Sequence, residues 1–222
     1  MRETLQRDGF VFQKKLLAHI PTLEVARRLG SVLDVDPSIR IPTVQSLNPR
    51  SISEATRNQY SGNYGLDLFP LHTDLAHWAI PPRYILLRCL VGTEDVFTNL
   101  LPASYIVGIV GSTTLQRAVL RTRRHRFACS GLVRAMSRHH NEEIFRWDPI
   151  FLQPLNGRAE ALKRVMLDPE WNDATIKILL RDPGDILLID NWRMLHGRSQ
   201  VPSRSANRHI ERVYLSEVFN DR

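Results

Sequence analysis

Short strand-like segments dominate the sequence from residue 83 onward, and they limit the folds that this chain can adopt. Turn formers separate these segments, and residues 181–185 (RDPGD) are the clearest turn signal. Regular strand–helix alternation is missing, which argues against a parallel doubly wound sheet. We therefore expect a mainly β fold, an antiparallel barrel or jelly roll with flanking helices. The segments, rich in β-branched and aromatic residues, are RYILLRCLV, DVFTNL, HRFACSGLV, TIKILL, GDILLIDN and RHIERVYLSEVF.

The first third of the chain has a different character. A short strand is predicted within DGFVFQKKLL, and a helix is predicted from Thr22, where apolar residues recur at three- and four-residue spacing as far as Leu33. Residues 36–70 are rich in Ser, Pro, Asn and Arg, and we expect them to form an ordered loop or a lid over a site. A second helix is predicted near residues 158–167.

No linker-like stretch divides the chain. With 222 residues and 43% hydrophobic content, it can bury one sizeable core. We therefore expect one domain, in which residues 1–63 are an N-terminal cap and loop and residues 64–222 are the jelly-roll core.

Charge and cysteine content narrow the classes of partner. The net charge of +7 favours anionic partners, because positive potential attracts small acids, phosphates or nucleic acid. Basic residues are most dense in residues 121–140, and in most proteins such a segment forms a solvent-exposed face. Cys89 and Cys129 lack the spacing of a thiolate metal site, so we interpret them as buried free thiols. No signal peptide or membrane span is recognised, so we expect a cytoplasmic protein without a membrane partner; the oligomeric state stays open.

The stretch FPLHTDLAHW contains two candidate metal ligands. His72 and Asp74 are one residue apart, so both side chains project from the same face of an extended segment and can reach one ion. The spacing alone is weak support, because His-x-Glu pairs also begin at His140 and His209.

A third candidate ligand, His196, lies near the end of GDILLIDNWRMLHGRS. Two imidazoles and one carboxylate on neighbouring strands can occupy one face of an octahedral ion and leave three positions open, which suits non-heme Fe(II). A structural zinc site would instead favour closed four-coordinate ligation, usually with thiolates.

Four stretches of the chain, HTD, PPRYILLRCL, GDILLIDNWRMLHGRS and NRHIERVYL, resemble the iron(II)/2-oxoglutarate-dependent dioxygenases of the taurine dioxygenase, clavaminate synthase and γ-butyrobetaine hydroxylase group. The densest part, DNWRMLHGR followed by RHIERVY, is similar to the γ-butyrobetaine hydroxylase branch. The resemblance implies a double-stranded β-helix, a jelly roll of the cupin-like type, with His72, Asp74 and His196 as iron ligands. It also implies that Arg208 binds the distal carboxylate of 2-oxoglutarate, and a guanidinium suits this task because it forms two parallel charge-assisted bonds.

The sequence departs from this group after the second core strand. Many members have Gly-Gly-acid-Thr there, and the threonine hydroxyl helps to bind 2-oxoglutarate. This chain has GTEDVFTNL, with Val96 at the threonine position. Thr98, two residues later on the same strand face, is the predicted substitute.

Four further residues are candidates for the substrate side of the site. Arg212 shares a strand face with Arg208, and related enzymes often use an arginine at this place to meet an anionic substrate group. Arg198 is expected to support the oxoacid or a substrate carboxylate, or else to form a surface salt bridge. Trp78 either lines the pocket or packs in the core. Asn191 is expected to hydrogen-bond a group that orients a ligand.

Together these features predict a 2-oxoglutarate-dependent hydroxylase that uses Fe(II) and O2 on an unactivated C–H bond of a small amino-acid-like or carboxylate-bearing metabolite. Because Asp74 is present, all three protein ligands are available and hydroxylation is favoured over halogenation, while desaturation and ring formation stay open. Two alternatives remain. The first is the same chemistry on a nucleotide or nucleic acid drawn by residues 121–140, and the second is a non-catalytic binding module on the same fold.

Overall fold

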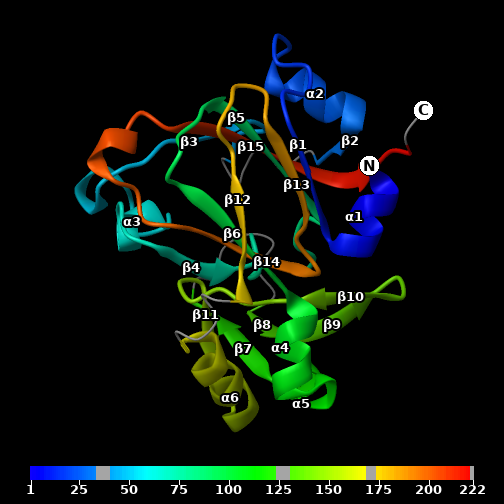
Figure 1. Cartoon of the computed structure of the whole chain (residues 1–222). Helices are drawn as coiled ribbons and strands as arrows, with labels where there is room; N and C mark the ends of the chain where they lie inside the picture. The colour runs from blue at the N-terminus through cyan, green and yellow to red at the C-terminus, as the bar shows by residue number, and fades with distance from the viewer. Residues whose placement is uncertain (34–40, 124–130, 169–173, 221–222) are drawn as a thin grey trace.

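Two antiparallel sheets form the centre of the molecule (Figure 1). The computed structural model describes residues 1–33, 41–123, 131–168 and 174–220. The large sheet has the order β1 (Phe10–Gln13), β13 (Ile186–Asp190), β5 (Tyr84–Val91), β15 (His209–Val218) and β2 (Gly30–Val32), and β3 (Gln45–Leu47) also pairs with β15. The small sheet has the order β12 (Ile176–Leu179), β6 (Phe97–Pro102), β14 (Met194–Arg198) and β4 (Phe69–His72).

Strand β5 shows why the large sheet is buried on both faces. Successive side chains alternate, so Ile85 and Leu87 pack with Leu100 of the small sheet in one core cluster. Leu86 points the other way and joins the cluster that contains Leu5 of helix α1 (Arg2–Asp8). Helix α2 (Thr22–Leu29) covers the same outer face. The first core layer therefore lies between the sheets and the second lies under the N-terminal helices.

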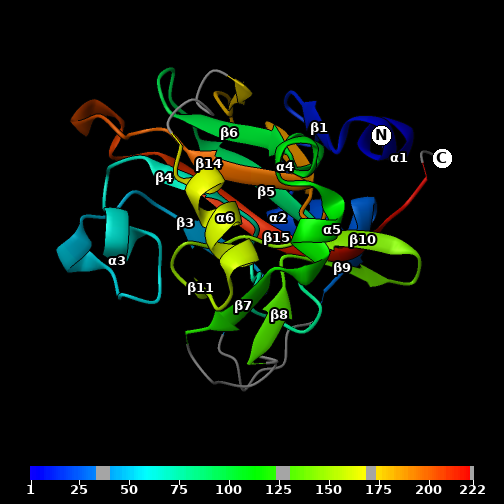
Figure 2. The ribbon, with the colours of Figure 1, turned by 90° about the horizontal axis from the view of Figure 1, so that it is seen from below.

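Helices and smaller sheets cover the outer face of the small sheet (Figure 2). Leu101 and Leu195 of the small sheet share a core cluster with Leu115 and Leu162 from two of the covering helices. The covering elements are α4 (Ala103–Val110), α5 (Ser112–Arg117), α6 (Gly157–Met166), a sheet of β11 (Leu152–Pro154), β7 (Val119–Thr122) and β8 (Leu132–Arg134), and the hairpin of β9 (Met136–His139) and β10 (Glu142–Phe145). The remaining short helices are η2 (Ile52–Glu54), α3 (Ser61–Tyr64) and η3 (Ser203–Ser205).

The mainly β prediction with flanking helices is confirmed, and most predicted elements are present. Helix α6 matches the predicted second helix, whereas the helix that begins at Thr22 ends at Leu29, so Leu33 lies beyond it. Residues 41–70 form several short elements rather than one loop, because β3 pairs with β15 and a capping box of Ser51 and Glu54 starts η2. Part of HRFACSGLV falls on residues 124–130, outside the described residues.

The structure describes one of the two cysteines. Cys89 is a buried free thiol, and burial raises its pKa to about 11. Cys129 lies outside the described residues. None of the helices in the described parts of the chain combines the length and apolar character that a bilayer-spanning helix requires.

Candidate metal centre

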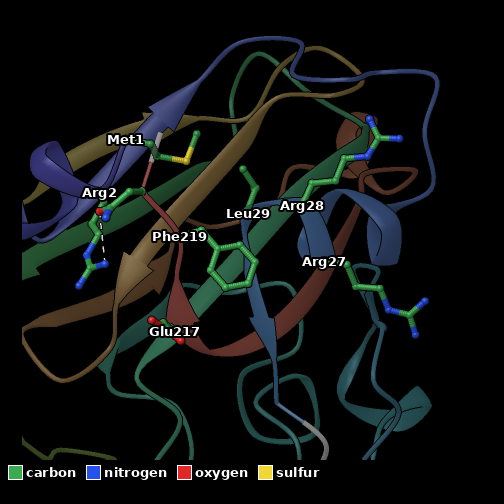
Figure 3. A pocket seen from close by; sticks show the side chains of 8 residues that line it. Met1, Arg2, Arg27, Arg28, Leu29, Glu217 and Phe219 are labelled. Atoms are coloured by element: carbon green, nitrogen blue, oxygen red, sulfur yellow. Dashed lines mark hydrogen bonds between the residues drawn. The ribbon is translucent and has the colours of Figure 1, made fainter. Parts of the chain in front are cut away.

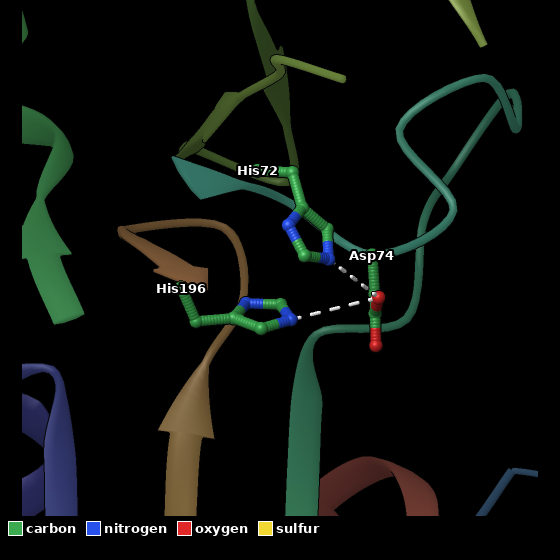
Figure 4. A group of neighbouring side chains, drawn as sticks. All are labelled: His72, Asp74 and His196. Carbon is green, nitrogen blue, oxygen red and sulfur yellow. Dashed lines mark ion pairs between the residues drawn. The ribbon is translucent and has the colours of Figure 1, made fainter. Parts of the chain in front are cut away.

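Three buried side chains converge where β4 and β14 pair (Figure 4). His72 is the last residue of β4 and lies opposite His196 of β14 in the antiparallel register, while Asp74 lies in the turn that follows β4. Oδ1 of Asp74 is 3.6 Å from Nε2 of His72 and 3.5 Å from Nε2 of His196. The ligand atoms all lie within 4.8 Å of one another. The structure therefore brings together the three residues that the sequence singled out.

The His72 ring is held in the orientation that a metal ligand needs. Its Nδ1 lies 2.8 Å from the carbonyl oxygen of Pro70. Because a carbonyl only accepts hydrogen bonds, Nδ1 carries the proton and the Nε2 lone pair faces Asp74. The Tyr60 ring stacks on one face of the His72 ring, and the two ring centroids are 3.9 Å apart.

The Asp74 carboxylate has two different oxygen environments. Oδ1 faces the histidines, whereas Oδ2 accepts hydrogen bonds from Arg212 Nη1 at 2.7 Å and Tyr214 Oη at 3.1 Å. Burial alone would raise the pKa of this carboxyl group, but Arg212 and His196 outweigh burial and hold the pKa well below its usual range. The site therefore presents an ionised carboxylate to the two imidazoles.

Asn191 lies behind Asp74 and away from the cavity wall. Its side-chain oxygen accepts from the backbone N–H of Asp74, and its amide donates to the Asp74 and Pro82 carbonyls. It is fully buried, so a direct substrate contact is excluded, and it fits the other expectation of orienting a ligand.

A cavity of about 830 Å³ opens beside the three side chains. A second hollow of about 740 Å³ lies between α2 and the segment after β15 (Figure 3), but the described residues that line it hold no group of metal-ligating side chains. The first cavity is therefore the candidate site. Its walls include the following sequence-predicted residues: His72, Asp74, Trp78, Thr98, His196, Arg198, Arg208 and Arg212.

Two arginines give the cavity a positive side. Arg208 is 6% exposed, its Nε has no partner among the described residues, and burial lowers its pKa to about 10. Arg198 donates to the Gly65 and Asp67 carbonyls, and its guanidinium lies over the Phe69 ring; it forms no salt bridge with any residue that the structure describes. Burial, and then the nearby Arg208, lower the pKa of Arg198 to about 10.

Thr98 lies next to this positive side. It is 5% exposed and is the register partner of Arg198 across β6 and β14. Val96, at the position where the resembling group has threonine, is fully buried and does not line the cavity. Thr98, which lies within β6, therefore lines the cavity, whereas Val96, which precedes the strand, does not.

Among the cavity-wall residues that sequence reasoning missed, four bear on the chemistry of the site. Asp148 is 1% exposed, and burial raises its pKa although its Oδ1 accepts the backbone N–H groups of two residues that follow it. Tyr60 lies close to Asp148, and its phenol pKa is raised well above the usual value by burial and by that carboxylate. Gln45 and Tyr214 complete the set. Of these, only Tyr214 carried a sequence signal, because it shares a strand face with Arg212.

Comparisons with known proteins agree with this geometry. Residues 132–214 match the family described as taurine catabolism dioxygenase TauD, TfdA family. The chain is 25% identical over 191 residues to an L-lysine 3-hydroxylase of Catenulispora acidiphila, and the match covers 78% of this chain and 51% of that protein. It is 28% identical over 113 residues to an enduracididine beta-hydroxylase of Streptomyces hygroscopicus, covering 48% of this chain and 33% of that protein. The matched part of the chain thus spans about half the length of the lysine hydroxylase and about a third of the length of the enduracididine hydroxylase.

A solved structure resembles the fold over nearly the whole chain. Asparagine oxygenase in complex with Fe(II), 3-hydroxyasparagine and succinate superposes with a TM-score of 0.67 at 18% identity, covering 96% of this chain and 77% of that one. Residues 132–214 therefore resemble the TauD, TfdA family in sequence, and nearly the whole chain resembles asparagine oxygenase in fold.

Proposed function

We propose that this chain binds Fe(II) and 2-oxoglutarate and, with O2, hydroxylates an unactivated C–H bond of an amino-acid-like metabolite. The observation that carries this proposal is the convergence of His72, Asp74 and His196 on the wall of a cavity that also receives Arg208. A relative named as a lysine hydroxylase and a solved asparagine oxygenase support the choice of an amino-acid substrate.

We also propose that the two facing sheets are a double-stranded β-helix and that the chain is one catalytic domain. Support comes from the core that both sheets share and from the similarity of fold to asparagine oxygenase. Within residues 1–63, three strands join the large sheet and both Gln45 and Tyr60 reach the cavity. The proposed N-terminal cap is therefore continuous with the sheet that it covers.

The donor set fits iron in type and in arrangement. His72 and His196 supply imidazole nitrogens and Asp74 supplies an ionised oxygen, a set that leaves three coordination positions open. When bound, Fe(II) supplies the activation of O2, coupled to conversion of 2-oxoglutarate into succinate and CO2. Because Asp74 supplies the third protein ligand, no coordination position is left for a halide in its place. This favours hydroxylation over halogenation.

Arg208, Thr98 and Arg198 are the proposed contacts of 2-oxoglutarate. A buried guanidinium without an ion-pair partner is costly, and a carboxylate at Arg208 removes that cost through two charge-assisted bonds. Thr98 offers a hydroxyl beside it, and Arg198 adds positive charge without giving up its carbonyl contacts. These residues bind and orient the oxoacid.

Asp148 suggests that the substrate carries a positively charged group. Among the described residues it has no cationic partner, although it is almost completely buried on the cavity wall. An ammonium or guanidinium group of the substrate would offset the cost of burying this charge. Arg212 remains the proposed contact of a substrate carboxylate, and Trp78 the proposed apolar contact.

The first experiment is an anaerobic absorption titration with Fe(II) and 2-oxoglutarate. The wild-type protein should develop the weak visible charge-transfer band of this class, while His72→Ala and Asp74→Ala should not. His140→Ala is the matched control, because His140 belongs to another His-x-Glu pair but is exposed and does not line the cavity. Succinate release should then be screened across amino acids. A folded wild-type protein that gives no band would contradict the proposal.

A further inference from the structure

The two oxygens of Asp74 are unequally available. Oδ2 accepts one hydrogen bond from the Arg212 guanidinium and one from the Tyr214 hydroxyl, at 2.7 and 3.1 Å. An ionised carboxylate oxygen has two strong acceptor sites, so these two donors occupy Oδ2. Oδ1 instead faces Nε2 of His72 and Nε2 of His196, at 3.6 and 3.5 Å.

Arg212 is itself held in place by the N-terminal part of the chain. Its Nη2 donates to Oε1 of Gln45 at 2.6 Å, and Gln45 is the register partner of Arg212 where β3 pairs with β15. One Nη atom therefore binds Asp74 while the other binds Gln45. A planar guanidinium that is bonded at both ends has little freedom to rotate.

The backbone of Asp74 is fixed as firmly as its side chain. Asn191 bonds both the N–H and the carbonyl of Asp74. It lies in the turn between β13 and β14, the strand that carries His196. Backbone and Oδ2 are thus anchored independently, and only Oδ1 is left facing the histidines.

We propose that Tyr214 and Arg212, with Gln45 behind Arg212, are positioning residues that restrict Asp74 to binding the metal through one oxygen. This inference rests on the proposed function, because it takes Asp74 as a metal ligand. If both oxygens bound, the carboxylate would fill four positions together with the two imidazoles and leave two open. Single-oxygen binding keeps three positions open, which is the number that a two-point oxoacid and O2 require.

The test is the binding of Co(II) alone, measured by its visible absorption and by infrared difference spectroscopy with and without the metal. Tyr214→Phe removes one of the two donors to Oδ2 and keeps the ring that packs in the core. We expect about tenfold weaker Co(II) binding. We also expect a smaller separation between the two stretching bands of the metal-bound carboxylate, because two-oxygen binding makes its oxygens more alike.

Two further variants keep the test decisive. Gln45→Leu should shift both measurements in the same direction, because Gln45 interacts with both Arg212 and the Tyr214 hydroxyl although it forms no hydrogen bond with Asp74. Ser216→Ala is the control, because it removes an exposed hydroxyl from the same face of β15 and should change nothing. If the wild-type protein binds Co(II), and Tyr214→Phe and Gln45→Leu have the same affinity and the same band separation as the wild type, this inference is overturned and the proposed metal site is not. A wild-type protein that does not bind Co(II) would overturn the proposed metal site as well.

Discussion

Two buried charges of opposite sign, Arg208 and Asp148, lie on the wall of one cavity, and neither has an ion-pair partner in the described part of the chain. A folded protein rarely keeps such groups without a role, because each loses hydration without gaining a counter-charge. They match the two proposed ligands, the 2-oxoglutarate anion at Arg208 and a cationic group of the substrate at Asp148.

At the residue scale, Arg208→Met should weaken 2-oxoglutarate binding by about 10- to 100-fold, because charge-assisted hydrogen bonds contribute roughly 1.5 to 3 kcal/mol. Co(II) affinity should not change, since Arg208 makes no contact with the three ligands. Isothermal titration calorimetry of 2-oxoglutarate into the Co(II)-loaded protein measures the change in affinity. Arg204→Met is the control, because it removes the same charge from an exposed position. Equal affinities in Arg208→Met and wild type would remove Arg208 from the cosubstrate site.

At the element scale, the pairing of β4 with β14 sets the distance between His72 and His196. Gly197 lies next to His196, and a Cβ built there would be 2.6 Å from the Phe69 carbonyl oxygen of β4. Gly197→Ala should therefore push the strands apart and lower the free energy of unfolding by about 1 to 3 kcal/mol, the usual cost of overpacking. Co(II) binding should weaken as well, because the two imidazoles are displaced from each other.

Gly108→Ala provides the contrast. Gly108 lies within helix α4, and a Cβ there meets nothing within 4 Å. Its replacement should raise the free energy of unfolding by roughly 0.5 to 1 kcal/mol, because alanine loses less backbone entropy in a helix. Urea unfolding and Co(II) titration of both variants separate strand crowding from a general effect of a methyl group. Unchanged Co(II) affinity in Gly197→Ala would show that this strand contact does not set the ligand geometry.

The elements also show which parts of the fold the sequence could predict. Strands β5, β13 and β15 were recognisable because apolar and β-branched residues run through them between clear turn formers. Helix α4 was missed because ASYIVGIV is apolar and rich in β-branched residues, which indicates a strand as readily as a buried helix. The β9–β10 hairpin was missed because His140 and Asn141 make its turn with φ of 46° and 66°, without the glycine that usually marks such a turn.

The candidate site was predictable to a different degree. Residue type made His72, Asp74 and His196 candidates, the resemblance to the dioxygenase group selected them, and that resemblance together with strand alternation pointed to Arg212. Asp148, Tyr60 and Gln45 come from segments without a distinctive pattern, and only tertiary packing carries them to the cavity. Such contacts are not encoded in local periodicity.

At the scale of the whole molecule, stability should depend on two buried groups that titrate in opposite senses. Burial lowers the pKa of His77 from 6.5 to about 4. The unfolded chain then binds more protons than the folded chain between these values, so stability contributed by His77 is lost as pH falls from about 6.5 to 4. Burial raises the pKa of Asp190 from 3.8 to about 6. Here the folded chain binds more protons, so stability is lost as pH rises from about 4 to 6.

The two contributions, each about 3 kcal/mol across its range, should partly offset each other in the wild-type protein. Single variants should separate them. Relative to wild type, Asp190→Asn should gain free energy of unfolding as pH rises from 4 to 6, because it lacks the group that charges at a cost. His77→Gln should lose it over the same range, because only the wild type recovers the stability of a neutral imidazole. Urea unfolding at half-unit pH steps gives both difference curves. Two flat curves would mean that neither burial perturbs folding, whereas curves of the same sign would show that one of the two groups has been assigned the wrong direction.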